Sequence, residues 1–174
     1  MIRRPHHDRD LSRAELELAA VDHLHRREEW QEHVVHDPSG ARTYHQLALD
    51  DHIEAWLICW SDGNDTGFHD HDLSQGAVGV ADGHVREETL ALGGDPVVRE
   101  VGPGGVFSFE ATDIHRVLHI GAETAVTLHL YSPPLRRMGS YEVLEDGRLA
   151  RRSIPAGEEL APAPGRNLAA VPTG

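Results

Sequence analysis

Residues 63–83 read GNDTGFHDHDLSQGAVGVADG, in which a single residue separates His69 from His71 and glycine-bearing turns flank the pair. Residues i and i+2 of a β-strand project from the same face, so two imidazoles at this spacing can bind one metal ion. The same pair also occurs in unrelated sequences that hold no metal. By itself, the pair is therefore only a weak prediction of a metal site.

Short β-type segments surround this stretch on both sides. They cover residues 44–49, 53–60, 76–80, 84–92, 97–101, 105–109, 116–119, 125–131, 141–144 and 149–154. Gly, Asp and Pro separate them at intervals of about 8–12 residues, which is typical of a sandwich or barrel. The sequence therefore predicts a mostly β domain over residues 37–154.

The two ends of the chain have different patterns. Ser12 and Glu15 have the spacing of a capping box, and apolar residues then recur at helical spacing. We expect one or two amphipathic helices over residues 12–36, within an N-terminal layer (1–36) packed on the β domain. Residues 155–174 are rich in Pro, Ala and Gly without periodicity, so we expect a flexible tail there.

Charge and cysteine content narrow the classes of partner. The 174 residues carry a formal net charge of −13, which is unfavourable for binding nucleic acid or an anionic membrane, and we expect neither as a partner. No apolar run approaches the roughly 20 residues that span a bilayer.

Cys59 is the only cysteine, so no intramolecular disulfide can form. With no apolar signal-peptide core near the start, we expect a cytoplasmic protein, as a monomer or weak homo-oligomer.

The stretch 63–83 resembles the first motif of the cupins, G-x5-H-x-H-x(3,4)-E-x6-G, except that the motif's Glu falls on Gln75 or Gly76. The second cupin motif can be laid over residues 104–119. The resemblance implies a single cupin (jelly-roll-like) β-barrel with N-terminal helices, and a metal site without a carboxylate. The implied metal ligands are His69, His71 and His115.

Four segments then resemble, in order and separation, the cysteine dioxygenase type I family. They are Ile58-Cys-Trp60, His69-Asp-His71, Ile114-His-Arg-Val117 and Leu128-His-Leu-Tyr-Ser-Pro-Pro-Leu135. The last run is the most specific of the four. The resemblance implies a non-haem Fe(II) thiol dioxygenase, which converts L-cysteine or a closely related small thiol and O2 into the sulfinate.

The resemblance also implies roles for the polar residues around the L-H-L-Y run. Tyr131 would act in catalysis and substrate binding through its hydroxyl, and His129 would orient Tyr131. Thr127 lies two residues earlier on the same strand face and would extend this polar line toward the substrate. The alternative is a polar strand face exposed to solvent.

The sequence departs from the family at two positions. Mammalian members form a thioether cross-link between the Tyr and a Cys whose position here is Gly76, so we expect no cross-link. Members that oxidise cysteine bind its carboxylate with an Arg, and alignment places His45 at that position, with Tyr44 beside it. A protonated His offers one donor where Arg offers a fork. Other residues that could supply the missing contact are Arg42, Gln46, Arg136 and Arg137.

Three functions stay open on this evidence. The first is oxidation of cysteine, and the second is oxidation of a thiol that lacks one head group, such as 3-mercaptopropionate, which His45 would favour. The third is a metal-binding or ligand-sensing cupin without turnover. The ligands do not fix the metal, since Ni, Cu and Zn bind similar nitrogen sites, and iron is implied by the family resemblance.

Other polar residues have plainer interpretations. Glu87 and Glu88 are expected at a solvated strand edge, and Asp70 is expected to point away from the metal and brace a turn. Cys59 and Trp60 lie in an apolar run and are expected in the core.

Overall fold

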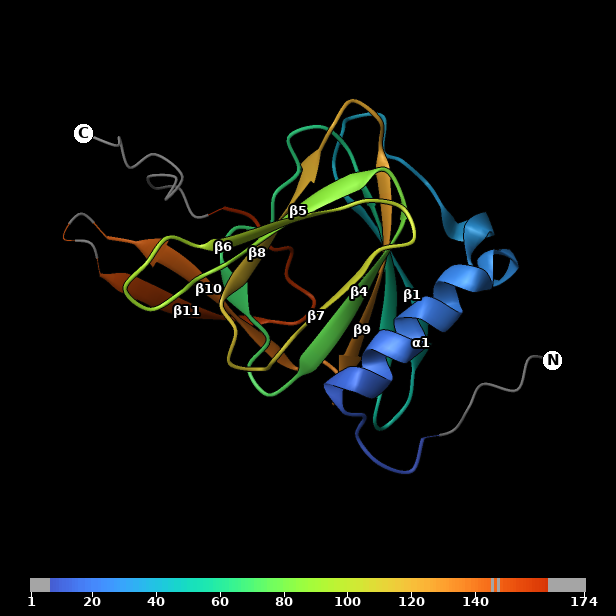
Figure 1. The fold of residues 1–174 in the computed structure, drawn as a ribbon, viewed down its shortest axis with the longest axis horizontal. Helices are drawn as coiled ribbons and strands as arrows, with labels where there is room; N and C mark the ends of the chain where they lie inside the picture. The colour runs from blue at the N-terminus through green and yellow to red at the C-terminus, as the bar shows by residue number, and fades with distance from the viewer. Residues whose placement is uncertain (1–6, 145, 147, 163–174) are drawn as a thin grey trace.

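The computed structural model describes residues 7–144, 146 and 148–162. These residues form one α-helix, two short 3-10 helices and eleven strands (Figure 1). The helices are α1 (Arg13–His25), η1 (Arg27–Glu29) and η2 (Gln31–His33). The strands are β1 (Thr43–Leu49), β2 (Glu54–Trp60), β3 (His69–Asp70), β4 (Gln75–Asp82), β5 (His84–Thr89), β6 (Val97–Val101), β7 (Val106–Phe109), β8 (His115–Ile120), β9 (Ala125–Ser132), β10 (Arg137–Val143) and β11 (Leu149–Pro155).

The strands make two antiparallel sheets, in the orders β1-β2-β9-β4-β7 and β11-β10-β3-β8-β5-β6. We expected a β-barrel, but among the described residues no ladder joins the edge strands of one sheet to those of the other. The fold is therefore an open pair of facing sheets, as in a jelly roll. An inner core of side chains from both sheets fills part of the space between them, and Trp60, Val85 and Phe107 are among its most buried members.

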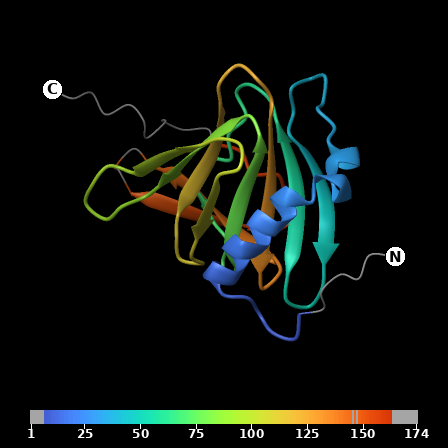
Figure 2. The same ribbon diagram turned by 45° about the vertical axis from the view of Figure 1, so that its right-hand side comes forward.

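Helix α1 lies across the outer face of the five-stranded sheet (Figures 1 and 2). It begins at Ser12, whose hydroxyl accepts a hydrogen bond from Glu15 N, while the Glu15 carboxylate accepts one from Ser12 N at 2.8 Å. Its buried residues, Leu16 and Ala20, pack with apolar side chains of β2, β4 and β9. The predicted capping box and packed helical layer are thus present.

The helix ends sooner than the periodicity over residues 12–36 suggests. Arg26 leaves the helical backbone region, with φ −102° and ψ 50°. Trp30 folds back so that its Nε1 donates to His23 O at 2.8 Å, and its ring is buried. Two 3-10 turns therefore replace the second half of the predicted helix, because they allow Trp30 to reach the core. No helix in the described ranges has the length and apolarity to cross a membrane.

The chain after β10 begins with the strand that the sequence predicts over residues 149–154. Residues 149–155 form β11, which pairs with β10 along its length. Residues 156–162 then contact the β domain, since Leu160 O accepts a hydrogen bond from Arg42. Residues 163–174 of the expected tail lie outside the described residues.

Candidate metal centre

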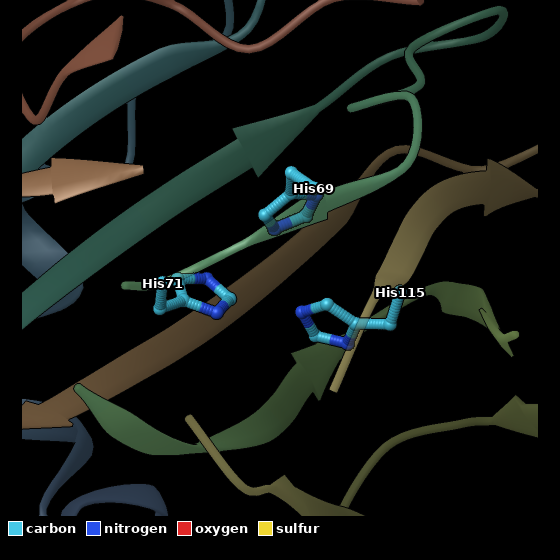
Figure 3. A group of neighbouring side chains, drawn as sticks. All are labelled: His69, His71 and His115. Carbon is cyan, nitrogen blue, oxygen red and sulfur yellow. The ribbon is translucent and has the colours of Figure 1, made fainter. Parts of the chain in front are cut away.

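Three histidines meet between the sheets: His69 in β3, His71 directly after β3, and His115 in β8. Strand β3 pairs with β8 so that His69 lies directly opposite His115. The ring centroids of His69 and His71 are 4.8 Å apart, and those of His69 and His115 are 4.7 Å apart. One nitrogen of each ring lies within 4.8 Å of the others, and the rings face a common space (Figure 3). The structure therefore brings together the three predicted ligands.

The hydrogen bonds of these rings test whether the group fits a metal. His69 Nδ1 lies 3.0 Å from Gly67 O, and His115 Nδ1 lies 2.7 Å from Glu87 Oε1. In both rings Nδ1 is engaged, which leaves Nε2 as the coordinating atom. His115 Nε2 is buried and has no hydrogen-bond partner within the described part of the chain. Since buried polar atoms are rarely left unpaired, this group fits a bound divalent metal.

The protonation of the histidines also suits metal binding. Burial, and next the neighbouring His115, holds the pKa of His69 well below its usual range. Burial, and next His69, does the same to the pKa of His71. Both imidazoles are therefore neutral at neutral pH, which is the form that coordinates a metal.

Glu87 is part of this centre, and our expectation of a solvated Glu87-Glu88 edge is wrong. Strand β5 lies between β6 and β8, so both carboxylates are covered: Glu87 has an exposed fraction of 0% and Glu88 of 8%. Glu87 bridges His115 and Arg99, and Glu88 pairs with Arg116 at 3.5 Å. A signal was present in the sequence, because Glu87 follows the apolar Val85 at the i+2 spacing of one strand face.

Asp70 anchors the short strand that carries the metal ligands. Its carboxylate accepts hydrogen bonds from Tyr141 OH at 2.6 Å, from Gly139 N at 3.1 Å, and from Arg151 through two nitrogens at 2.7 and 2.8 Å. Burial raises the pKa of Asp70, but these hydrogen bonds lower it by more, so the carboxyl stays ionised. As expected, Asp70 braces the chain rather than joining the metal centre.

A line of hydrogen bonds runs along β9 toward the cavity. Trp60 Nε1 donates to Thr127 Oγ1 at 2.7 Å, Thr127 Oγ1 lies 2.8 Å from His129 Nε2, and His129 Nδ1 lies 3.2 Å from Tyr131 OH. The indole N–H can only donate, so the Thr127 hydroxyl accepts a hydrogen bond from Trp60. The Thr127 hydroxyl can in turn donate a hydrogen bond to His129 Nε2. His129 then carries its proton on Nδ1 and donates to Tyr131. The Tyr131 hydroxyl proton is left free to donate to a ligand.

The pKa values of this line agree with that assignment. Burial, followed by repulsion from His115 and Arg42, lowers the pKa of His129 to about 3, so the ring is neutral. Burial, followed by the charge of Glu54, raises the pKa of Tyr131, so the phenol keeps its proton. Thr127, which we expected to contact substrate, has an exposed fraction of 0% and stands behind His129.

One cavity of about 440 Å³ joins these groups. It is lined by the three metal-site histidines, by His129 and Tyr131, and by apolar side chains from both sheets. Arg42 and Tyr44 also line it. The Arg42 guanidinium is almost wholly covered and lies over the Trp60 ring, 5.1 Å from its centre.

His45 does not belong to this cavity, which corrects the position at which we expected the carboxylate contact. Successive residues of β1 point to opposite faces, so Tyr44 faces inward and His45 outward. The His45 ring stacks on His33 with centroids 3.7 Å apart. Gln46 is engaged with Glu54 at 2.9 Å. The remaining candidates, Arg136 and Arg137, are exposed.

The comparisons with known proteins agree with the site. The sequence model of the family described as "Cysteine dioxygenase type I" matches residues 9–143. The chain belongs to the cysteine dioxygenase type I family. A cysteine dioxygenase type 1 from Danio rerio is 25% identical over 96 residues, which are 49% of this chain and 48% of that protein. The chain thus matches about half the length of this curated relative.

Solved structures agree with the fold. A double-stranded β-helix protein from Klebsiella pneumoniae has a TM-score of 0.50 and 13% identity, and the match covers 69% of this chain and 91% of that one. The protein TT1209 from Thermus thermophilus has a TM-score of 0.50 and 17% identity, and the match covers 59% of this chain and 92% of that one. At these identities the likeness shows the fold alone. The mostly β cupin fold that the sequence predicts is confirmed.

Gly76, which corresponds to the cross-linking Cys of mammalian family members, lies next to Tyr131. Gly76 lies directly opposite Tyr131 in the β4–β9 ladder. A Cβ atom at Gly76 would come within 2.3 Å of the Phe109 ring and 2.9 Å of Leu130 O. Phe109 therefore occupies the space that a side chain at this position would need.

Proposed function

We propose that this chain is a non-haem Fe(II) thiol dioxygenase that converts L-cysteine or a closely related small thiol to the sulfinate. The reaction is R–SH + O2 → R–SO2H, in which the thiol supplies the electrons and both oxygen atoms end on sulfur. The main support is one cavity that holds three buried histidines and the proton-bearing Tyr131. Membership of the cysteine dioxygenase type I family supports iron as the metal.

The residues of the cavity have distinct tasks in this proposal. Bound iron would supply open coordination positions at which thiolate and O2 meet. Tyr131 donates its hydroxyl proton to the bound substrate, and His129 holds that hydroxyl in place. Arg42 and Tyr44, which also line the cavity, bind the polar head of the thiol. The apolar lining excludes water from the reacting sulfur.

The experiment that tests this function measures turnover with a defined metal. The metal-free protein is loaded anaerobically with one equivalent of Fe(II) and is then exposed to O2 with L-cysteine, cysteamine or 3-mercaptopropionate. We expect one O2 consumed per thiol, with the sulfinate detected by mass spectrometry. Oxygen uptake by none of these thiols, with iron bound at one per chain, would refute the proposal.

A dioxygenase for 3-mercaptopropionate is the second candidate. Arg42 is the one cation among the described residues that line the cavity, and it suits the carboxylate of this thiol as it suits that of L-cysteine. The earlier reason for this candidate, a histidine in place of arginine, no longer applies because His45 lies outside the cavity. A clear preference for L-cysteine in kcat/KM would exclude it. We also propose a reducing, cytoplasmic setting, which suits both Fe(II) and a free Cys59.

A further inference from the structure

The segment after β11 covers part of the cavity that holds the histidines. We call residues 156–160 the strap (red in Figure 1). All five residues of the strap line that cavity. At its start, Ala156 N donates to Arg136 O at 3.3 Å and Glu158 N donates to Pro155 O at 3.0 Å. The strap is therefore held by hydrogen bonds beside the proposed substrate site.

The next two residues fix the far end of the strap. A Cβ atom added to Gly67 would lie 2.8 Å from Pro162 Cα and 2.9 Å from Ala161 O, so the two backbones are in close contact. Gly67 has φ +66° and lies two residues before His69. The strap is thus packed on the segment that leads into the metal ligands.

The strap places a carboxylate beside Arg42 and Tyr44, the residues at which the polar head of the substrate is proposed to bind. Arg42 Nη2 donates to Leu160 O and to Glu159 Oε1, the latter at 3.4 Å. Tyr44 OH donates to the same Glu159 oxygen at 3.2 Å. Arg42 is almost fully covered, whereas the Glu159 side chain is 55% exposed. The polar head of a substrate therefore meets a paired positive and negative charge and not an isolated arginine.

The pairing of Arg42 with Glu159 determines which charges on a substrate are favourable in this part of the cavity. A thiol whose head is only a carboxylate would be drawn to Arg42 but repelled by Glu159, which already occupies one of its nitrogens. A thiol that carries an ammonium group gains an attractive partner in Glu159. Because the Glu159 side chain is partly exposed, its charge should change the preference between thiols more than the overall affinity for them.

We propose that Glu159 is a specificity-determining residue that selects small thiols bearing an ammonium group over thiols with a carboxylate alone. The inference rests on the proposed function and deepens it by naming the substrate class. L-Cysteine satisfies both charges and cysteamine satisfies Glu159, whereas 3-mercaptopropionate satisfies only Arg42.

The test compares Glu159→Gln and Glu159→Lys with Glu100→Gln as the matched control. The Glu100 side chain is as exposed as that of Glu159, pairs with Arg86 at 2.6 Å and does not line the cavity. We expect Glu159→Gln to lower the ratio of kcat/KM for L-cysteine over 3-mercaptopropionate about tenfold, and Glu159→Lys to lower it further. Glu100→Gln should leave the ratio within about twofold of the wild type. An unchanged ratio in both Glu159 variants would overturn the inference.

A binding measurement separates this inference from the proposed function. Anaerobic calorimetry gives the Kd of cysteamine and of 3-mercaptopropionate for the Fe(II)-loaded protein, without turnover. If the wild type oxidises no thiol, the dioxygenase proposal fails, and the Kd ratio still tests the role of Glu159. A shift of about tenfold toward 3-mercaptopropionate in Glu159→Gln supports the inference. Equal Kd ratios in the wild type and Glu159→Gln contradict it.

Discussion

The carboxylate of Glu87 lies 2.7 Å from Nδ1 of His115, and both side chains are closed off from solvent. Arg99 pairs with the other oxygen of Glu87. A carboxylate in this position fixes the imidazole tautomer and turns Nε2 toward the metal. Glu87 therefore positions one of the three histidines of the candidate metal centre.

Replacement of Glu87 by Gln should weaken metal binding. The amide oxygen can still accept the hydrogen bond, but the negative charge that makes the imidazole a better ligand is lost. We expect the Kd for Fe(II) or Zn(II) to rise about 10- to 100-fold. Competition with a chromophoric chelator measures this change directly.

The neighbouring carboxylate supplies the control for that experiment. Glu88 is similarly covered, but it pairs with Arg116 and not with a histidine. Glu88→Gln should leave the metal Kd within about twofold of the wild type. Equal losses of affinity in the two variants would mean that general destabilisation, and not the contact to His115, controls the affinity.

Tyr131→Phe should separate catalysis from metal binding. The substitution removes only the hydroxyl that His129 holds toward the cavity, and no metal ligand changes. We expect kcat to fall about 100-fold, in the range of a lost proton donor, with the metal Kd unchanged. Stopped-flow oxygen consumption and the chelator titration give the two values. A variant with wild-type kcat would remove Tyr131 from the reaction.

Arg42 and His45 make a second contrast between two residues of one segment. Arg42 lies under the strap in the cavity, whereas His45 stacks on His33 at the outer surface. Arg42→Gln should raise KM for L-cysteine about tenfold or more, because a buried charged partner of the substrate is lost. His45→Gln should leave KM within about twofold. A larger effect of His45→Gln would restore it as the carboxylate contact.

The parts of the site that could be predicted from the sequence depend on strand periodicity. His69 and His71, and likewise His129 and Tyr131, are two residues apart, so strand geometry brings each pair to one face. Together with the motif resemblance, this was enough to predict the histidine group and the polar line. The same periodicity accounts for the place of His45, because its neighbour Tyr44 lines the cavity and successive strand residues point to opposite faces.

Other features depend on contacts that no local pattern records. The burial of Glu87 follows from two flanking strands and from partners on them, Arg99 and His115. The strap has no periodicity, and its contact with Arg42 joins residues 118 positions apart. The early end of α1 follows from the return of Trp30 to the core, and helical spacing alone does not show it.

Gly76→Ala should test how tightly the cavity wall is packed beside Tyr131. The added Cβ would overlap the Phe109 ring, which is itself buried, and would approach Leu130 O. Overpacking of this kind costs about 1–3 kcal/mol of stability. Urea unfolding of the metal-free protein measures the loss, and an unchanged midpoint would show that Phe109 moves aside without cost.

The stability of the metal-free protein should fall in acid, and His129 should account for a defined part of the loss. The pKa of His129 is about 3 in the fold, against about 6.5 in an unfolded chain. Between these values the unfolded chain binds a proton that the folded chain does not. The stabilising contribution is therefore present above about pH 6.5 and is lost as the pH falls toward about 3.

A His129→Gln variant lacks this contribution while keeping His69 and His71, which are present in both proteins. Between about pH 7.5 and about pH 5, the wild type should lose about 2 kcal/mol more of its unfolding free energy than the variant. Urea unfolding at the two pH values, in the presence of a chelator, measures the difference. Equal losses in the two proteins would mean that His129 takes up its proton in the folded state, which the hydrogen bonds to Thr127 and Tyr131 oppose.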